Sequence, residues 1–149
     1  MAWTQVLTIP AILALGVVYG TDMFFAVVAR PALAHVSEAS LTEVMGRLHE
    51  VADRRMPLFG VLGIVCTLGL LAVAPSFYVI VAFGAQVIHL GLYFGVAKPV
   101  NAALTAAVNR GESLTDAPQL QRRWDSVIVP RALVLGVAMV YLALIAIQA

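Results

Sequence analysis

The sequence predicts an all-α fold, an integral membrane four-helix bundle formed by one domain over residues 1–149. Hydrophobic residues make up 62% of the chain and charged residues 11%, and the mean hydropathy is +0.96, far above the range of soluble domains. Four apolar runs have about the length that crosses a bilayer. The basic residues, except Arg131 just inside the fourth run, fall in two of the connections between these runs. Together these observations predict a polytopic membrane protein.

The four predicted spans are residues 6–29, 57–74, 77–97 and 126–147. Ala74-Pro75-Ser76 is the whole connection between the second and third spans, and so short a turn makes them antiparallel neighbours. The third span is expected to continue as a helix to Asn109, with Gly111 just beyond its end. Long helical extensions therefore flank the spans. Pro57 and Pro99 either break or only kink their helices, and the sequence leaves both alternatives open.

Two further local patterns have structural consequences. Ser40 to Glu43, Ser-Leu-Thr-Glu, matches a capping box and predicts a helix start ahead of the second span. In the first span, Arg30 follows Asp22 by eight residues, which places both on one face of a regular helix.

The distribution of basic residues predicts the orientation. Eight of the nine Lys and Arg lie between spans one and two or between spans three and four, and the ninth, Arg131, lies just inside span four near the second of these connections. By the positive-inside rule, these charged connections are cytoplasmic and the tight turn is on the outer side. Both termini are then outside, in a multi-pass protein of a bacterial-type inner (plasma) membrane.

Composition also limits the partners. No basic cluster alternates with aromatic residues, so nucleic-acid binding is not expected. Cys66 is the single cysteine, which excludes an internal disulfide and a CxxC redox site. The expected partners are the lipid bilayer and a lipophilic small molecule. A homo-oligomer formed through Gly16 and Gly20, or through Gly91 and Gly95, is an alternative to packing of these glycines within one bundle.

Counting helical turns brings the polar residues of all four spans into one layer. A rise of about 1.5 Å per residue places His89 roughly 20 Å from the outer ends, and Asp22 and Arg131 roughly 25–27 Å. The remaining polar candidates fall deeper still, while the outer half of the bundle is apolar. Arg131 cannot lose its charge, so Asp22 or Asp125 is its expected partner. We therefore expect a polar cavity that opens toward the cytoplasm.

Three side chains in this layer have alternative roles. His49 and Asp53 are four residues apart, a spacing suited to two ligands of one metal or to a His–carboxylate base; a solvated surface contact is the alternative. His89, inside a span, is a structural, catalytic or ligating histidine. Tyr93 lines the cavity or only packs. A metal site of His49, Asp53 and His89 requires closing a depth difference of about 15 Å. No cofactor is evident. A haem held between two histidines would need two of them inside the membrane, and His89 is the only one clearly inside.

Three segments resemble a family of small four-helix membrane proteins that includes the anthrone oxygenases. Residues 98–104, KPVNAAL, and 122–144, RRWDSVIVPRALVLGVAMVYLAL, carry its polar motif, and residues 20–33, GTDMFFAVVARPAL, are similar to its first helix. Pro130 departs from the family pattern. The family's Asn, Trp and Arg correspond to Asn101, Trp124 and Arg131.

The resemblance implies a membrane oxidoreductase or monooxygenase that oxidises a planar, lipid-soluble anthrone- or quinol-like aromatic with dioxygen. Such chemistry needs a base, an oxyanion stabiliser and an apolar slot. The candidate bases are His49 and His89, and the oxyanion candidates are Arg131, Lys98 and Asn101. The expected substrate contacts are Trp124, Tyr93, Phe94, Lys98 and Asp22. The alternative is a non-enzymatic membrane protein that binds a small molecule or metal, or a transporter or complex subunit.

Overall fold

The chain forms four long helical rods. A computed structural model describes residues 3–148, so residues 1, 2 and 149 of the predicted domain lie outside the described residues. The helical segments are α1 (Trp3–Phe24), the π-helix η1 (Phe25–Ala29), α2 (Arg30–Leu33), α3 (Glu38–Val73), α4 (Phe77–Leu92), the π-helix η2 (Tyr93–Ala97), α5 (Lys98–Asn109) and α6 (Ala117–Gln148). Since η1 and α2 continue α1, and η2 and α5 continue α4, the rods correspond to the four predicted spans with their extensions.

Each rod is long and apolar enough to cross a membrane. Large apolar side chains cover the outside of the bundle, including Leu13, Leu58 and Ile147, which are 67%, 70% and 82% exposed. In water such a surface would be strongly unfavourable, whereas in a bilayer it faces lipid. The all-helical character predicted from the composition is thus confirmed, and the four long apolar rods fit the predicted multi-pass membrane protein.

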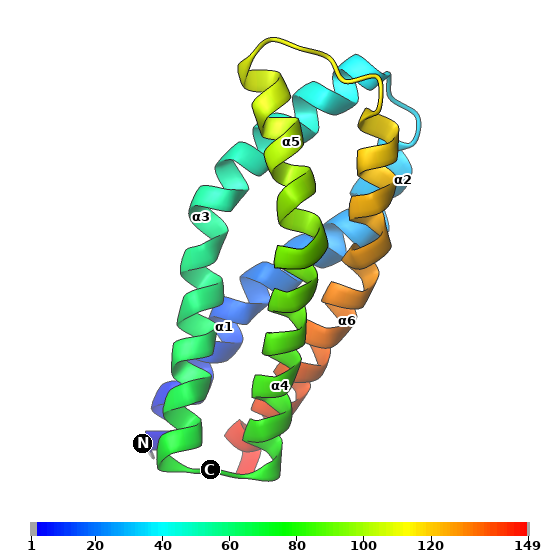
Figure 1. The fold of residues 1–149 in the computed structure, drawn as a ribbon. Coiled ribbons are helices and arrows are strands. Elements are labelled where there is room, and N and C mark those ends of the chain that lie inside the picture. Colours follow the sequence, from blue (N-terminus) through cyan, green and yellow to red (C-terminus); the bar gives the residue numbers. More distant parts are fainter. Residues whose placement is uncertain (1–2, 149) are drawn as a thin grey trace.

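Figure 1 shows the arrangement of the rods. The two ends of the chain and the turn between α3 and α4 lie at one end of the bundle, and the longer connections before α3 and after α5 lie at the other. α1 packs against α3 and α6, α4 packs against α6, and α5 packs against α3. The α3–α4 contact is much less extensive than these four. The bundle is therefore loosest between α3 and α4, in the part nearer their shared turn.

Prolines bend the rods without breaking them. Pro57 lies inside an uninterrupted α3, and Pro99 is the second residue of α5, which directly follows η2. In both π-helices a backbone N–H bonds to the carbonyl five residues earlier, Arg30 to Phe25 and Lys98 to Tyr93. The residue after Arg30 is Pro31, and the residue after Lys98 is Pro99. Each proline lacks an N–H and crowds the preceding turn, and the wider π-turn makes room for it. The same four-residue pattern, Val-Ala-Arg/Lys-Pro, marks both places.

The first π-turn lies between Asp22 and Arg30, which the sequence places on one helical face. Its wider turn takes up one extra residue, so eight residues along this rod still span about two turns. The half-exposed Arg30 side chain lies 3.8 Å from Asp125. Such an exposed ion pair contributes little to stability.

The ends of α3 and α5 show one wrong and one correct prediction. The capping residue of α3 is Ser37, not Ser40, because the Ser37 side chain accepts a hydrogen bond from the Ser40 backbone N–H. At the end of α5, Gly111 has a positive φ of 69°. Its N–H bonds to the Val108 carbonyl, and the next N–H, from Glu112, bonds to the Ala107 carbonyl. This is the Schellman pattern in which glycine is favoured.

One glycine allows a close approach between α3 and α5. A Cβ atom on Gly46 would lie 2.7 Å from the Leu104 carbonyl oxygen and 2.9 Å from the Val108 side chain. The Thr105 hydroxyl donates to the Gly46 carbonyl at 3.2 Å across the same contact. In contrast, a Cβ on Gly91 would meet nothing within 4 Å. Gly46 is therefore needed for helix packing, and Gly91 is not.

We predict that Gly46→Ala destabilises the bundle by about 1–3 kcal/mol, because backbone atoms of α5 must move to admit the methyl group. Gly91→Ala is the matched control and should leave stability unchanged or slightly increased, since alanine favours a helix. Thermal unfolding of both variants in one detergent, followed by circular dichroism, measures the difference. Equal melting temperatures would contradict the close approach.

Candidate functional site

A cavity of about 660 Å³ lies inside the bundle, within the size range of small-molecule sites. All four rods line it, and most of its wall is apolar. The predicted site residues Asp22, His49, Asp53, His89, Tyr93, Phe94, Lys98, Asn101, Trp124 and Arg131 all line this cavity. The polar layer inferred from turn counting therefore converges on one space.

A buried ionic cluster joins three of the rods. The Arg131 guanidinium Nη2 of α6 donates to Asp22 Oδ1 of α1 at 2.9 Å. The other carboxylate oxygen, Asp22 Oδ2, lies 3.1 Å from His89 Nε2 of α4. All three residues are more than nine-tenths buried. Of the two acids expected to pair with Arg131, the structure selects Asp22.

The cluster determines the tautomer of His89. Its Nε2 lies 3.1 Å from the Asp22 carboxylate and 3.4 Å from Arg131 Nε. A nitrogen lone pair facing a carboxylate at that distance would be repelled, whereas an N–H is attracted. Nε2 therefore carries the proton and donates to Asp22, and the longer contact with Arg131 is not a hydrogen bond. His89 is thus committed to the cluster through this nitrogen.

A second polar cluster surrounds Asp53 of α3. The Tyr93 hydroxyl and the Asn101 Nδ2 group both donate to Asp53 Oδ1, each at 2.9 Å. Tyr93 is in η2 and Asn101 is in α5, so the carboxylate joins α3 to the third rod. Packing alone was the alternative expected for Tyr93, and this hydrogen bond shows that alternative to be wrong. Because Oδ1 accepts both bonds, Oδ2 can accept another.

The two clusters meet at Tyr93. The Arg131 guanidinium carbon lies 5.5 Å from the centre of the Tyr93 ring, within the range of a cation–π contact. Polar contacts consequently run from Asp22 on α1 to Asp53 on α3 through Arg131 and Tyr93. All four rods are thereby connected at the depth of the cavity.

Aromatic rings form a third part of the wall. The rings of His49 and Trp124 lie 5.5 Å apart, and Phe25 packs edge-on against Trp124 at 5.1 Å. Phe25 is the first residue of η1, so the π-turn before Pro31 places it here. Trp124 and His49 are both 4% exposed. These rings close the cavity at the end nearer the long connections.

Four polar atoms of cavity-lining residues have no hydrogen-bond partner within residues 3–148. They are His49 Nε2, Gln86 Oε1, Asn101 Oδ1 and Trp124 Nε1. Each is closed off from water in this arrangement, and an unsatisfied buried polar group costs about 1–3 kcal/mol. The orientation of the Asn101 and Gln86 side-chain amides follows from chemistry. The Asp53 carboxylate and the Ala82 carbonyl can only accept hydrogen bonds, so the amide atom that faces each of them is the nitrogen. A ligand with polar groups, reached by small side-chain rotations, would relieve this cost.

The predicted metal ligands do not converge. His89 bonds to Asp22, while Asp53 bonds to Tyr93 and Asn101. In the part of the chain that the structure describes, no three His, Cys, Asp or Glu residues are grouped as a metal site would require. His49 and Asp53 share a face of α3 without a hydrogen bond between them among the described contacts. Their arrangement suits a ligand contact better than a metal pair.

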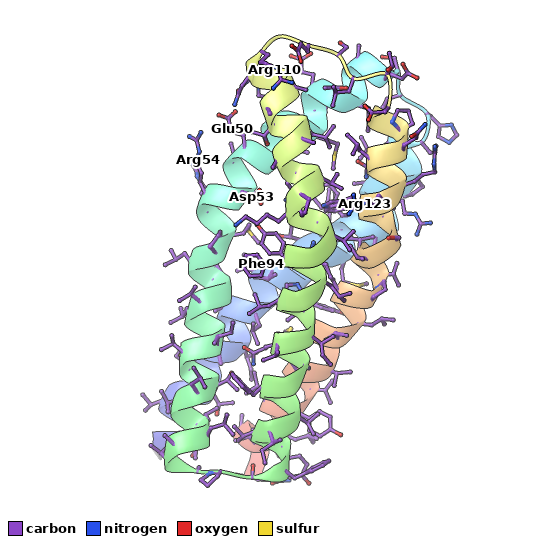
Figure 2. The ribbon with its side chains drawn as sticks, in the orientation of Figure 1. Glu50, Asp53, Arg54, Phe94, Arg110 and Arg123 are labelled. Carbon is purple, nitrogen blue, oxygen red and sulfur yellow. The ribbon has the colours of Figure 1, made fainter. Side chains whose placement is uncertain are left out.

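Two predicted substrate contacts lie at the cavity's edge. Phe94 is 55% exposed, and the Lys98 ammonium lies 5.0 Å from the centre of its ring. In Figure 2, Phe94 and Asp53 both lie between the ribbon of α3 and the rod of α4 and α5. Phe94 and Lys98 therefore border the opening of the cavity, while Asp53 lies within it.

Sequence reasoning missed some cavity residues. Gln86 is fully buried and donates to the Thr67 hydroxyl at 2.8 Å; its position one turn before His89 in an apolar run was an available signal. Phe25 was not distinguished from its apolar neighbours, because only the π-turn turns it inward. Gly60 lines the cavity with open space around it, and no local pattern indicates this.

Comparison with known proteins adds no assignment: no family model, no curated protein and no solved structure matches the chain.

We predict that Asp22→Asn destabilises the protein by about 3–5 kcal/mol, because it leaves the Arg131 charge buried without its partner. A second change, Arg131→Met, should restore part of the lost stability by removing that charge. Asp116→Asn, at an exposed position, is the matched control. Unfolding in detergent, followed by circular dichroism, measures all four proteins, and an unchanged Asp22→Asn midpoint would contradict the buried pair.

Proposed function

We propose that the chain binds a planar, lipid-soluble aromatic molecule in this cavity and oxidises it with dioxygen, as the anthrone oxygenases it resembles do. One observation carries the proposal: a ligand-sized apolar cavity in which four separate rods bring together a base, cations and unsatisfied polar atoms. A bundle held together by polar pairing alone would have no such space.

The proposed overall reaction is anthrone plus dioxygen to anthraquinone plus water. A base removes a proton from the methylene carbon between the two aryl rings, and the carbanion shares its negative charge with the ring carbonyl oxygen. The carbanion then transfers its electrons to dioxygen with formation of a carbon–oxygen bond, and the peroxide takes up the proton. Loss of the second methylene hydrogen and cleavage of the O–O bond release water and leave the new carbonyl. Dioxygen is the oxidant, and no other redox partner is required.

We assign the role of base to His49. Its Nε2 atom has no partner in the described structure, and a small rotation of the ring would let it reach a ligand proton, as a base must. His89 donates its Nε2–H to Asp22, so only its Nδ1 atom could accept a proton. In this proposal His89 is a positioning residue that holds the Asp22–Arg131 pair.

Two cations support the oxyanion role. Arg131 faces the cavity from α6 and Lys98 borders it from α5. A positive charge in an apolar, water-poor site stabilises a developing oxyanion strongly. Asn101 has its amide nitrogen bound to Asp53, so it presents its oxygen, which suits a hydroxyl group of the ligand better than an oxyanion.

The proposed setting is the inner membrane of a bacterial-type cell. The connections that carry the basic residues would face the cytoplasm, with both termini and the α3–α4 turn outside. The cavity's polar end then lies nearer the cytoplasm. Of the glycines considered for a homo-oligomer, a Cβ atom added to Gly16 would lie 3.6 Å from Met139 of the same chain, whereas one added to Gly20, Gly91 or Gly95 would meet open space. Only the pair of Gly91 and Gly95 is therefore open at both positions. A dimer through α4 is the variant that agrees with this packing.

A non-enzymatic binding protein is the second candidate. The mutual pairing of Asp22, His89 and Arg131 favours it, because these residues are satisfied without a substrate. Binding without turnover of any oxidisable aromatic would distinguish this candidate from the enzyme.

We predict that the purified protein in lipid nanodiscs oxidises anthrone faster than the uncatalysed rate, and that His49→Ala lowers kcat by roughly 100-fold or more. Oxygen consumption and the absorbance of anthraquinone measure the rate. His35→Ala replaces an exposed histidine and is the matched control. Lack of turnover by the wild type over a panel of anthrones and quinols would reject the enzymatic proposal, and full activity of His49→Ala would reject its assignment as the base.

A further inference from the structure

Asp53 offers the cavity a charged hydrogen-bond acceptor. Its Oδ1 atom is occupied by the Tyr93 hydroxyl and the Asn101 amide, each at 2.9 Å. The second oxygen, Oδ2, has no hydrogen bond among the described contacts, and Asp53 lines both the main cavity and a smaller neighbouring pocket. Two donors hold the carboxylate in place, so a ligand hydroxyl would meet a pre-oriented acceptor. A hydroxyl bound to a carboxylate forms one of the stronger hydrogen bonds in proteins.

The cavity is long, and its polar groups gather at one end. On α3 its wall runs from Leu48 to Ile64, and on the facing rod from Asn101 to Gln86. The ends of these stretches are 16 and 15 residues apart in sequence, or roughly 22–24 Å at the rise of a helix. Beyond Asp53 and the ionic cluster, the wall is formed mainly by apolar residues, among them Leu15, Val18, Ile64, Leu90 and Leu135. The space thus has a polar head region and a long apolar region.

The cavity opens sideways, between α3 and α4. Val61 of α3 and Phe94 of η2 line it and are themselves 59% and 55% exposed. The two helices diverge from their shared turn (Figure 1), and they contact each other less than the neighbouring pairs do. The flanking surface carries exposed Leu58 and Leu62. A molecule that passes between α3 and α4 would therefore come from the hydrocarbon phase of a bilayer.

We propose that the cavity takes a phenolic lipid, a molecule with a hydroxylated aromatic head and a flexible apolar chain, which enters from the bilayer between α3 and α4. Its hydroxyl donates to Asp53 Oδ2, its ring lies near Tyr93, and its chain occupies the apolar region toward Ile64. This inference rests on the aromatic-binding part of the proposed function and narrows its substrate class.

The hydroxylated aromatic head of the ligand, and not its apolar chain, determines which lipids this site selects. A chain that moves from lipid to an apolar cavity gains little, because lipid tails are as apolar as the cavity wall. The hydroxyl gains a charged acceptor that hydrocarbon lacks. An analogue without the hydroxyl leaves that acceptor unpaired, which is the condition for strong rejection. The expected preference of a phenol over its methyl ether is roughly 10- to 100-fold.

The first test is direct binding of tritiated 4-octylphenol to the protein in nanodiscs, measured by scintillation proximity. Unlabelled 4-octylphenol should displace it roughly 10- to 100-fold better than 4-octylanisole, and anthrone should compete for the same site. Asp53→Asn should reduce the preference for the phenol to a fewfold, whereas Asp116→Asn, at an exposed position, should leave it unchanged.

The second test fills part of the cavity. Gly60 lines the cavity and the exposed Gly20 does not, yet an added Cβ at either meets nothing within 4 Å. Gly60→Leu should lower 4-octylphenol binding at least tenfold by occupying cavity space, and Gly20→Leu should bind as the wild type does. Melting temperatures of the two leucine variants, which should agree, show whether a loss of binding comes from misfolding.

The outcomes separate this inference from the proposed function. Equal affinity for 4-octylphenol and 4-octylanisole, or unchanged binding by Gly60→Leu, overturns the phenolic-lipid inference even if anthrone is oxidised. If the protein oxidises anthrone but 4-octylphenol does not displace anthrone from it, the phenolic-lipid inference is also overturned. If neither compound binds or reacts, the proposed function fails together with the inference.

Discussion

The buried pairing of Asp22 with Arg131 is the interaction on which the rest of the structure depends. An arginine inside a membrane bundle remains charged, so α6 can be stable only if an acid lies beside it. Asp22 brings α1 to that place, and its second oxygen brings α4 there through His89. Three of the four rods therefore have a fixed register at the depth of the cavity. The Arg131 guanidinium also lies over the Tyr93 ring. Through the Tyr93 hydroxyl, this register is connected to Asp53 on α3, the one remaining rod.

The cavity exists because the helices that surround it are irregular. Prolines at equivalent places in the first and third rods follow π-turns, and these turns begin at Phe25 and Tyr93, which both line the cavity. A regular helix would point its side chains elsewhere after each turn. α3 approaches α5 closely at Gly46 but diverges from α4. The same bundle is consequently tight around its polar end and open toward lipid along its apolar length.

Much of this could be predicted from the chain by counting turns. Asp22, His89 and Arg131 were placed at similar depths from helical rise alone, and they are in contact. The end of α5 at Gly111 followed from glycine's tolerance of positive φ. One error arose where two neighbouring serines could each begin the helix: Ser37 rather than Ser40 caps α3. The local sequence pattern did not decide between them.

The sequence by itself determined the four apolar rods, their antiparallel order around the short turn at Pro75, and the set of polar residues that had to meet. It did so because length, hydropathy and charge are properties of each segment separately. Only the tertiary structure decided the partners: Asp22 rather than Asp125 for Arg131, and Tyr93 with Asn101 for Asp53. Partner choice depends on helix rotation and tilt, which are set by packing between rods. The sideways opening beside Val61 and Phe94 has the same origin, since it lies where α3 and α4 make few contacts.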